Sequence, residues 1–391
     1  MSSYGYQPTL ARPEGRVGSC CATACLLALL VLALAAAGCT EPVAEGGRLS
    51  TVLGGEELDG FRRATMPASI EFPRDHGAHP DFRSEWWYFT AVLHDARGRD
   101  FGVQFTLFRQ ALLPHSGRGP WRTAQVYMGH LAVSDVEAGI HHQAERLVRG
   151  HPRLAGVSHV PNVPAAPAPA SKASFAAWIE GWRLASVSTA FLPMTLIAED
   201  AKIGLDLHLE QTKPIVLQGD AGFSAKGPAN ASYYYSVPRL AVSGTVRVAG
   251  DSHEVTGRGW LDREWSTSVL AREYAGWDWF ALQLDDGRDF MLYQLRRRDG
   301  AQDAYNGATA IDPGGDAKRL DPADVRLTAT HSWRGWPVRW ELSVGDERFA
   351  IVAAFDDQVM ETFVRYWEGL VWVESESGER LGSGYMELTG Y

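Results

Sequence analysis

The chain has few cysteines, and all of them lie near its beginning. Only four occur among 391 residues, namely Cys20, Cys21, Cys25 and Cys39. If the first three leave with an N-terminal leader, the remaining thiol has no partner and no disulfide can form within the chain. An exported domain without disulfides must be held together by its apolar core, and the remaining length is sufficient to build one.

Several catalytic signatures are also missing. Residues 257–262 lack the third glycine of a dinucleotide-binding loop and open no helix. Neither a Gly-x-Ser-x-Gly elbow nor a His-Glu-x-x-His zinc motif occurs. His76 and His79 could bind a metal, but no third ligand follows at a suitable spacing, so we expect them to cap a loop. We therefore expect no cofactor and no metal.

The chain has fewer basic residues than acidic ones. Lysine and arginine number 37 against 47 acidic residues, which gives a formal net charge of −10. A nucleic-acid partner would require a basic face, so this class of partner is excluded. The hydrophobic fraction of 45% and the charged fraction of 21% are typical of a globular protein.

The one long apolar run lies at the N-terminus. Residues 25–34 follow Arg12 and Arg16 and precede small residues, which is the order of a secretory signal. Residues 36–39 resemble a bacterial lipobox with Cys39 as the acylated residue; the alternative is ordinary cleavage beside a chance cysteine. We predict a lipoprotein signal peptide at 1–38 and a tether at 39–69. The lipobox resemblance implies export and a lipid-anchored outer-membrane protein that faces the periplasm.

Beyond the tether, helical periodicity is weak and short strands are predicted. Residues 321–325 can form a single helical turn, with Asp321 as its cap and Pro322 at its first position. Residues 160–170 contain four prolines and must be irregular. Regular short strands favour barrels or sandwiches, so we predict an all-β protein. Alternating or short apolar runs lie at 85–93, 101–109, 128–135, 176–185, 195–199, 203–210, 241–248, 339–344, 348–355, 369–374 and 384–388.

One pattern occurs twice. The aromatic-led residues 86–93 precede a Gly-Arg-Asp-Phe sequence at 98–101, and residues 279–284 precede the same four residues at 287–290. Each copy continues into an apolar return strand, so each predicts a hairpin. Two copies indicate a duplicated domain rather than a solenoid. We expect domains at 70–255 and 256–391.

Residues 257–295 place acids among tryptophans. Asp262, Glu264 and Asp278 lie beside Trp260, Trp265, Trp277 and Trp279. A carboxylic acid that apolar surroundings keep neutral can donate a proton, and desolvated aromatic faces stabilise a cation by ~2 kcal/mol. The structural alternative is that the indoles are packing anchors and the acids form buried ion pairs. Such pairs could join Asp262 to Arg263, and Glu85 to Arg83 or Arg109.

Residues 76–88, 260–266, 277–280, 366–369 and 384–391 together resemble the lipocalin-like carotenoid 1,2-hydratase family. This family includes hydroxyneurosporene synthases and an exported branch, the AttH group, labelled as secreted hydrolases. The resemblance covers roughly residues 70–391. It implies two lipocalin-like, calycin-type antiparallel β-barrel domains that pack together.

The resemblance also implies an activity. Hydratases carry Asp-His-Asn-Trp where this chain has residues 262–265, and they use a Tyr and an Asp where it has Tyr293 and Leu295. It favours a hydro-lyase that hydrates a carbon–carbon double bond of an isoprenoid, carotenoid or lipid-like molecule. A non-catalytic lipid carrier of the outer membrane and a cofactor-free cyclase stay open. The predicted catalytic residues are Asp262, Glu264, Trp265, Asp278 and Tyr293, and the predicted ligand-binding residues are Glu85, Trp86, Trp87, Trp260, Trp277 and Trp279.

Overall fold

The computed structural model describes residues 47–48, 59–115, 122–159, 174–268, 270–301 and 303–391. The signal peptide expected at 1–38, Cys39, most of the tether and the loop expected at 160–170 lie outside these ranges. The described residues form strands and two short 3-10 helices, η1 (Arg74–His76) and η2 (Pro322–Asp324), so the predicted all-β class is confirmed. No helix in the described part of the chain has the length and apolarity needed to span a bilayer.

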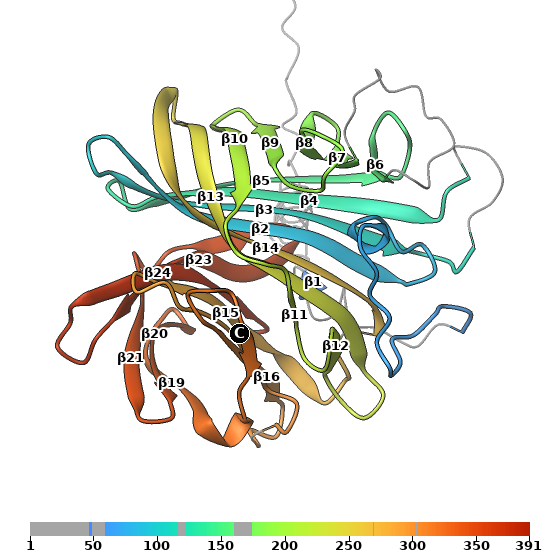
Figure 1. Cartoon of the computed structure of the whole chain (residues 1–391). Helices are drawn as coiled ribbons and strands as arrows, with labels where there is room; N and C mark the ends of the chain where they lie inside the picture. Colours follow the sequence, from blue (N-terminus) through green and yellow to red (C-terminus); the bar gives the residue numbers. More distant parts are fainter. Residues whose placement is uncertain (1–46, 49–58, 116–121, 160–173, 269, 302) are drawn as a thin grey trace, which may run out of the picture. The chain divides into compact units, whose positions relative to one another are not determined.

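The first sheet is antiparallel and curls into a nearly closed barrel (Figure 1). Its thirteen strands follow the order β5-β4-β3-β2-β14-β13-β10-β9-β8-β7-β6, with β11 and β12 paired to β13. Its interior is filled by buried apolar side chains such as Trp87, Phe105 and Leu207. The strands are β2 (Ser84–Asp95), β3 (Asp100–Ala111), β4 (Gln125–Asp135), β5 (Ile140–Arg149), β6 (Ala155–His159), β7 (Phe175–Ile179), β8 (Trp182–Ser186), β9 (Met194–Glu199), β10 (Ile203–Gln211), β11 (Val216–Leu217), β12 (Phe223–Ala225), β13 (Ala231–Val248) and β14 (Asp251–Ser268).

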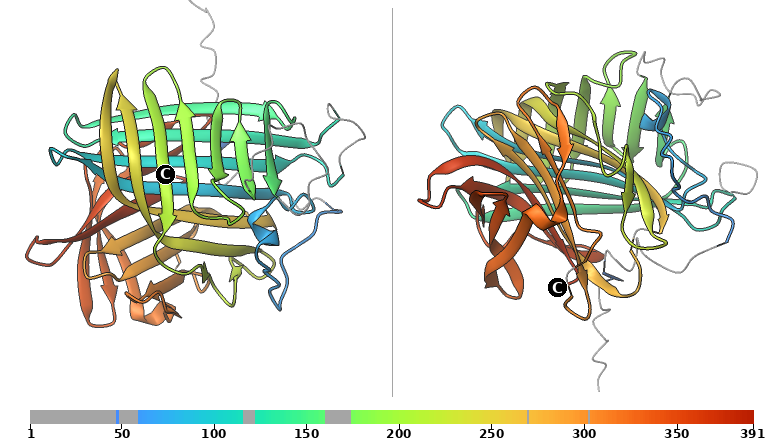
Figure 2. Two further views of the ribbon diagram at one scale, coloured as in Figure 1. Left: turned by 45° about the horizontal axis from the view of Figure 1, so that its top comes forward. Right: turned by 60° about the horizontal axis from the view of Figure 1, so that its bottom comes forward.

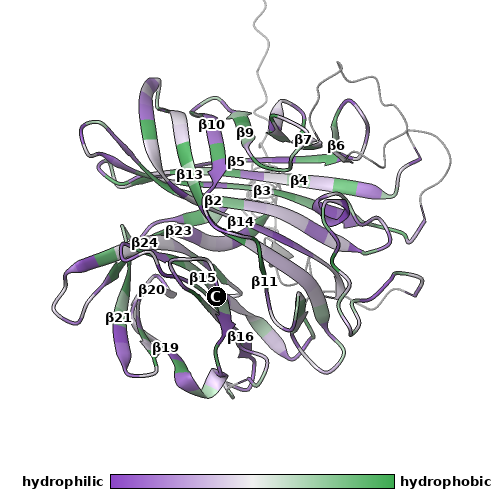
Figure 3. Ribbon diagram, viewed as in Figure 1, coloured by the Kyte–Doolittle hydropathy of each residue, from purple (hydrophilic) through white to green (hydrophobic). Residues whose placement is uncertain are grey.

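The second sheet has eleven strands in the order β18-β17-β16-β15-β24-β23-β21-β20-β19, with β1 and β22 paired to β23. It encloses a separate core that includes Phe280, Trp340 and Ile351. Hydrophilic residues gather at its turns, for example between β20 and β21 (Figure 3). The strands are β1 (Gly47–Arg48), β15 (Tyr274–Leu284), β16 (Asp289–Arg297), β17 (Gly307–Ile311), β18 (Ala317–Arg319), β19 (Val325–Trp333), β20 (Trp336–Val344), β21 (Glu347–Ala353), β22 (Val359–Glu361), β23 (Val364–Glu374) and β24 (Arg380–Thr389).

The repeated sequence pattern forms equivalent hairpins in the two sheets. The first copy is the β2–β3 pair and the second is the β15–β16 pair. Phe101 and Phe290, the last residues of the two Gly-Arg-Asp-Phe sequences, are each buried in the core of their own sheet. In the second hairpin Gly287 has a φ of +94°, which the tight turn requires. The two predicted hairpins are thus confirmed.

Other details differ from the sequence-based expectations. The single run predicted at 176–185 is a hairpin, β7–β8, because Glu180 adopts a left-handed conformation at a turn. The run predicted at 241–248 is the end of the 18-residue strand β13. The helical turn expected at 321–325 is η2, where the Asp321 side chain accepts a hydrogen bond from the Ala323 amide.

The chain passes from the first sheet to the second between Ser268 and Tyr274. The domain boundary expected between residues 255 and 256 therefore falls inside β14. The continuous pairing of β14 with both β13 and β2 keeps the whole strand in the first sheet. Residues 257–295, which read as one motif in the sequence, are divided between the two sheets.

The two sheets pack against each other through their outer faces (Figure 2). Successive side chains of a strand point to opposite faces of a sheet. On β14, Arg263 and Trp265 therefore face one way and Asp262 and Glu264 the other. The packed faces share one apolar cluster, to which β2, β13, β14, β15, β16, β23 and β24 contribute.

Candidate active site

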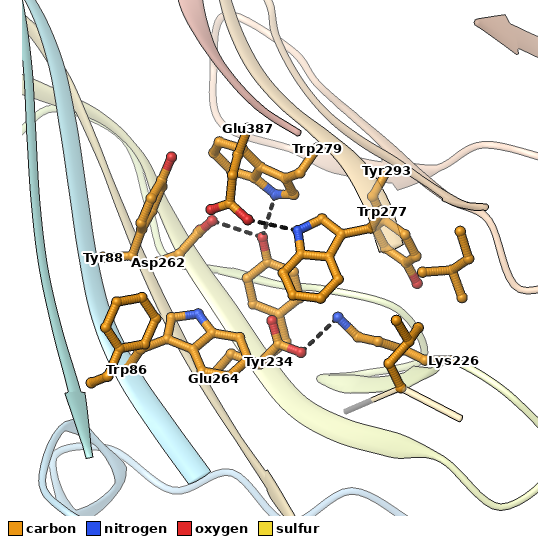
Figure 4. Close-up of a pocket in the computed structure, with 13 residues that line it drawn as sticks. Trp86, Tyr88, Lys226, Tyr234, Asp262, Glu264, Trp277, Trp279, Tyr293 and Glu387 are labelled. Atoms are coloured by element: carbon orange, nitrogen blue, oxygen red, sulfur yellow. Dashed lines mark hydrogen bonds and ion pairs between the residues drawn. The ribbon is translucent and has the colours of Figure 1, made fainter. Parts of the chain in front are cut away.

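A narrow pocket lies between the outer faces of the two sheets (Figure 4). Its interior volume is about 50 Å³, and the whole depression, with its solvent-open part, is about 610 Å³. One water needs roughly 10–15 Å³ of such space, so the interior holds a few waters or one end of a ligand. This interface pocket is lined by Trp86, Tyr88, Phe108, Lys226, Tyr234, Asp262, Glu264, Leu270, Trp277, Trp279, Tyr293, Leu295 and Glu387.

Asp262 is buried and accepts three hydrogen bonds. The Tyr234 hydroxyl donates to Oδ2 at 2.7 Å, and Ser236 Oγ and Trp260 Nε1 donate to Oδ1 at 2.5 and 2.7 Å. Burial raises the pKa of Asp262 to about 7, against the effect of these donors and with a smaller contribution from Glu264. Near neutral pH this carboxyl group can therefore exist in either protonation state.

The groups around Asp262 are oriented as donors. Trp279 Nε1 donates to the Tyr234 hydroxyl at 3.1 Å, so the phenolic proton is available to Asp262. Gln218 Nε2 donates to Ser236 Oγ at 2.9 Å in the same manner. An indole N–H can act only as a donor. The network thus stabilises an ionised Asp262 and prepares it to act as a base.

Glu264 is paired with a buried lysine. Lys226 Nζ lies 2.6 Å from Glu264 Oε1, and also 5.6 and 5.0 Å from the ring centroids of Tyr234 and Tyr293. Burial alone would lower the pKa of Lys226, but the Glu264 carboxylate raises it above its usual value. Lys226 is therefore a cation, and it lies in an ion pair with Glu264.

A second pair of acids comes from the other sheet. Glu368 and Glu387 are register partners on β23 and β24, so their side chains are neighbours on one face of the sheet. Tyr88 donates to Glu368 Oε1 and Trp277 Nε1 donates to Glu387 Oε1, both at 2.7 Å. Glu387 lines the interface pocket, whereas Glu368 is fully buried behind it.

The Glu368–Glu387 pair retains a proton. Burial raises the pKa of Glu387 to about 7 and that of Glu368 well above its usual value. Two adjacent carboxyl groups cannot both ionise easily. Among the described residues, no donor reaches Glu368 Oε2. The pair therefore holds a proton beside the pocket.

The predicted site residues divide into two groups. Six of them line the interface pocket: Asp262, Glu264, Tyr293, Trp86, Trp277 and Trp279. Trp260 does not line it but reaches Asp262 through its indole N–H. Asp278 lies on the opposite face of β15, where Gln294, Arg296 and the Tyr391 hydroxyl donate to its carboxylate. Burial raises the pKa of Asp278.

Glu85, Trp87 and Trp265 belong to a polar cluster on the inner side of the first sheet. Glu85 accepts hydrogen bonds from Arg109 and, at 3.1 Å, from Arg263. Although burial opposes it, the adjacent Arg109 holds the pKa of Glu85 well below its usual range. The Arg263 guanidinium lies 3.9 Å from the ring centroid of Trp87. Arg263 therefore pairs with Glu85, and the expected pair with Asp262 is not formed.

The two histidines considered as metal ligands hold the segment around η1 against the first sheet. His76 Nδ1 lies 2.7 Å from the Tyr235 hydroxyl. His79 bonds to Glu85 at 3.0 Å and stacks on Trp265 with 3.9 Å between ring centroids. Within the ranges that the structure describes, no group of three or more His, Cys, Asp or Glu side chains could hold a metal ion.

Comparisons with known proteins agree with this architecture. The AttH-like family matches residues 63–391. The chain belongs to the AttH-like family. A crystal structure described as an AttH from Nitrosomonas europaea is 33% identical, with a TM-score of 0.71, and the match covers 85% of this chain and 99% of that one.

Two more distant structures share the fold of this AttH-like chain. Kievitone hydratase from Nectria haematococca is 13% identical with a TM-score of 0.59, over 85% of this chain and 96% of the other. CghA, solved with Sch210972, is 14% identical with a TM-score of 0.51, over 79% and 89%. At these identities the likeness shows the fold alone. A search of curated proteins gives no match.

Sequence reasoning missed part of the AttH-like pocket. Glu368 follows Trp367 and Glu387 lies between Met386 and Leu388, and an acid in such apolar surroundings is a signal that could have found them. Lys226 lies in a connection between β12 and β13, where nothing local distinguishes it from a surface lysine. The other lining residues that were not predicted are Tyr88, Phe108, Tyr234, Leu270 and Leu295.

Proposed function

We propose that this AttH-like protein is a hydro-lyase that adds water to a carbon–carbon double bond of an apolar, isoprenoid- or lipid-like molecule, or catalyses the reverse reaction. One observation carries the proposal. Glu387, with Glu368 buried behind it, faces a narrow pocket whose walls include indole and phenol rings. A general acid works best when its pKa lies near the working pH, and the pKa of Glu387 is raised to about 7.

In the first step Glu387 gives its proton to one alkene carbon. The π electrons form the new C–H bond, and a positive charge develops on the other carbon. Trp277 and Trp279 line the pocket where this charge would develop. Their ring faces can stabilise a desolvated cation by ~2 kcal/mol or more.

In the second step a water oxygen bonds to the cationic carbon, and the water proton passes to Asp262. The three donors around Asp262 favour its ionised form, as a base requires. Glu264 is engaged in the ion pair with Lys226, so we give it no proton-transfer role. Loss of a proton from Asp262 and gain of one by Glu387 restore the starting state. Trp265 and Asp278 do not line the pocket, so we assign them supporting roles.

The reaction can be tested with acyclic prenols. The purified protein is incubated with geraniol, farnesol or geranylgeraniol in heavy-oxygen water, and the products are analysed by mass spectrometry. We expect a product that carries one labelled water. In Glu387→Gln turnover should fall by about 10²–10⁴-fold, while prenol affinity, followed by tryptophan fluorescence, changes by less than about threefold because the amide keeps the shape of the side chain.

The matched control is Glu379→Gln, at an exposed position in the turn between β23 and β24, which should leave turnover unchanged. A prenol that binds and is recovered unaltered would indicate the carrier instead. A product of unchanged mass but altered structure would indicate a cyclase. Either result would overturn the hydro-lyase assignment.

We also propose that the protein is exported and attached to the outer membrane, facing the periplasm, through a lipid on Cys39. The apolar residues 25–34 and the small residues before Cys39 support this placement. In Cys39→Ser the protein should move from the membrane fraction to the soluble periplasmic fraction. Retention of the variant in the membrane fraction would contradict the lipid anchor.

A further inference from the structure

One side chain separates two cavities. Tyr293 lines the interface pocket and also a second cavity of about 210 Å³. We call the second cavity the side pocket; it is lined by Met66, Gly219, Asp220, Phe223, Ser224, Ala225, Met291, Tyr293, Gly307, Ala308, Thr309 and Arg319. Tyr293 is the one residue that the two linings have in common, so its ring forms the wall between them.

The ring of Tyr293 is fixed from three sides. Its hydroxyl lies 3.1 Å from Ser224 Oγ, and the Lys226 ammonium lies 5.0 Å from the ring centroid. Tyr293 on β16 is opposite Gly307 on β17, and a Cβ atom at position 307 would collide with the ring. The ring thus packs directly on the backbone of Gly307, which has no side chain. One neutral hydrogen bond, to Ser224, holds the hydroxyl there, and such a bond is weak enough for a ligand to displace.

Part of the lining of the side pocket is apolar. Met66, Phe223, Met291 and Ala308 supply this part, whereas Asp220, Ser224, Thr309 and Arg319 make the rest of the lining polar. Methionine side chains adapt readily to flexible ligands. The enclosed interior of the interface pocket, about 50 Å³, has room for the reacting end of a prenyl chain, and the remainder must extend into the solvent-open part or past Tyr293. A cavity of about 210 Å³ directly behind one wall provides that space.

We propose that the side pocket binds the tail of an acyclic prenyl chain and that Tyr293 determines how long a chain the protein accepts. This inference rests on the proposed function. With the ring in place, a short chain is confined to the interface pocket. A longer chain must displace the ring and break its hydrogen bond to Ser224, and the tail then enters the side pocket.

Chain-length preference tests this assignment through binding alone. Affinities for geraniol, farnesol and geranylgeraniol are measured by the fluorescence of Trp86, Trp277 and Trp279, which line the interface pocket. The wild-type protein should bind geraniol most tightly. Tyr293→Ala should raise the affinity for geranylgeraniol by about tenfold or more, since each additional buried methylene contributes ~0.8 kcal/mol. Tyr293→Phe keeps the ring but loses the hydrogen bond, so it should shift the preference less.

A double variant shows where the tail lies. Ala225 lines the side pocket but not the interface pocket, and it is partly exposed. Ala225→Leu fills the side pocket and should cancel the gain in Tyr293→Ala. An identical length preference in the wild type and in both Tyr293 variants, or a gain that survives Ala225→Leu, would overturn the inference. If the wild-type protein binds no prenol, the ligand class of the proposed function fails instead.

Discussion

Glu368 and Glu387 occupy opposing positions on β23 and β24, so the two carboxyl groups are neighbours and titrate as one unit. Only Glu387 lines the interface pocket. Glu368 is fully buried and bonded to Tyr88 of the other sheet. The acid that faces the pocket is therefore backed by a second acid from which it can regain a proton.

The raised pKa values predict how stability depends on pH. Burial raises the pKa of Glu387 and that of Asp262 to about 7, from 4.5 and 3.8 respectively. Between these limits the folded state binds more protons than the unfolded state, so the free energy of unfolding falls as pH rises. In Glu387→Gln, whose side chain mimics the protonated acid, this fall should be smaller by roughly 1–3 kcal/mol.

Thermal unfolding from about pH 5 to about pH 8 at constant ionic strength measures this effect. The exposed control Glu379→Gln should retain the wild-type slope. If stability depended on pH in the same way in the wild-type protein and in Glu387→Gln, Glu387 would titrate normally. That result would contradict its proposed role as the general acid.

Arg263 stands where the resemblance to the carotenoid hydratases implies a histidine, and its contacts predict the effect of introducing that residue. Arg263 is fully buried, pairs with Glu85 at 3.1 Å and donates to two backbone carbonyls. Arg263→His leaves the Glu85 carboxylate with one charged partner fewer and should lower the free energy of unfolding by about 3–5 kcal/mol. Denaturant unfolding checks this value. The exposed pair of Arg365 with Glu361 provides the control Arg365→His, expected to change stability by about 1 kcal/mol or less.

Asp289, within the second Gly-Arg-Asp-Phe sequence, links the two sheets. Its carboxylate accepts hydrogen bonds from Lys213 and Arg239 of the first half, both at 2.6 Å, and is fully buried. Asp289→Asn leaves two cations facing a neutral amide and should lower the free energy of unfolding by about 3 kcal/mol.

Asp286→Asn is the matched control for this prediction, because Asp286 is half exposed and bonded to Arg288 within the same turn. It should change stability by about 0.5 kcal/mol or less. Equal effects of the two substitutions in denaturant unfolding would show that the cross-sheet link contributes nothing beyond a surface pair.

The sequence predicted the class of fold, the two hairpins and half of the pocket, since these depend on local pattern and turn chemistry. The sequence pattern groups Asp278 with Asp262 because tryptophans lie within three residues of each acid. Strand alternation turns Asp278 away from the pocket face that Trp277 and Trp279 share, and a stricter use of the two-residue period would have separated it.

What the sequence could not supply depends on pairing between distant strands. Glu387 comes beside Trp277 because β24 pairs with β15, more than a hundred residues earlier in the chain. The first half of β13 is not predicted as a strand from the sequence. Tyr233, Tyr234 and Tyr235 are all buried, so hydropathy does not alternate there.

The interface pocket lies outside both barrel cores, between the outer faces of two similar halves. If these halves descend from one ancestral unit, a solitary barrel would have had no such enclosure. The interface pocket is then a product of gene duplication, formed when one copy first covered the other. New ligands could be accommodated there by substitutions on the outer faces of the sheets, without changes to either apolar core.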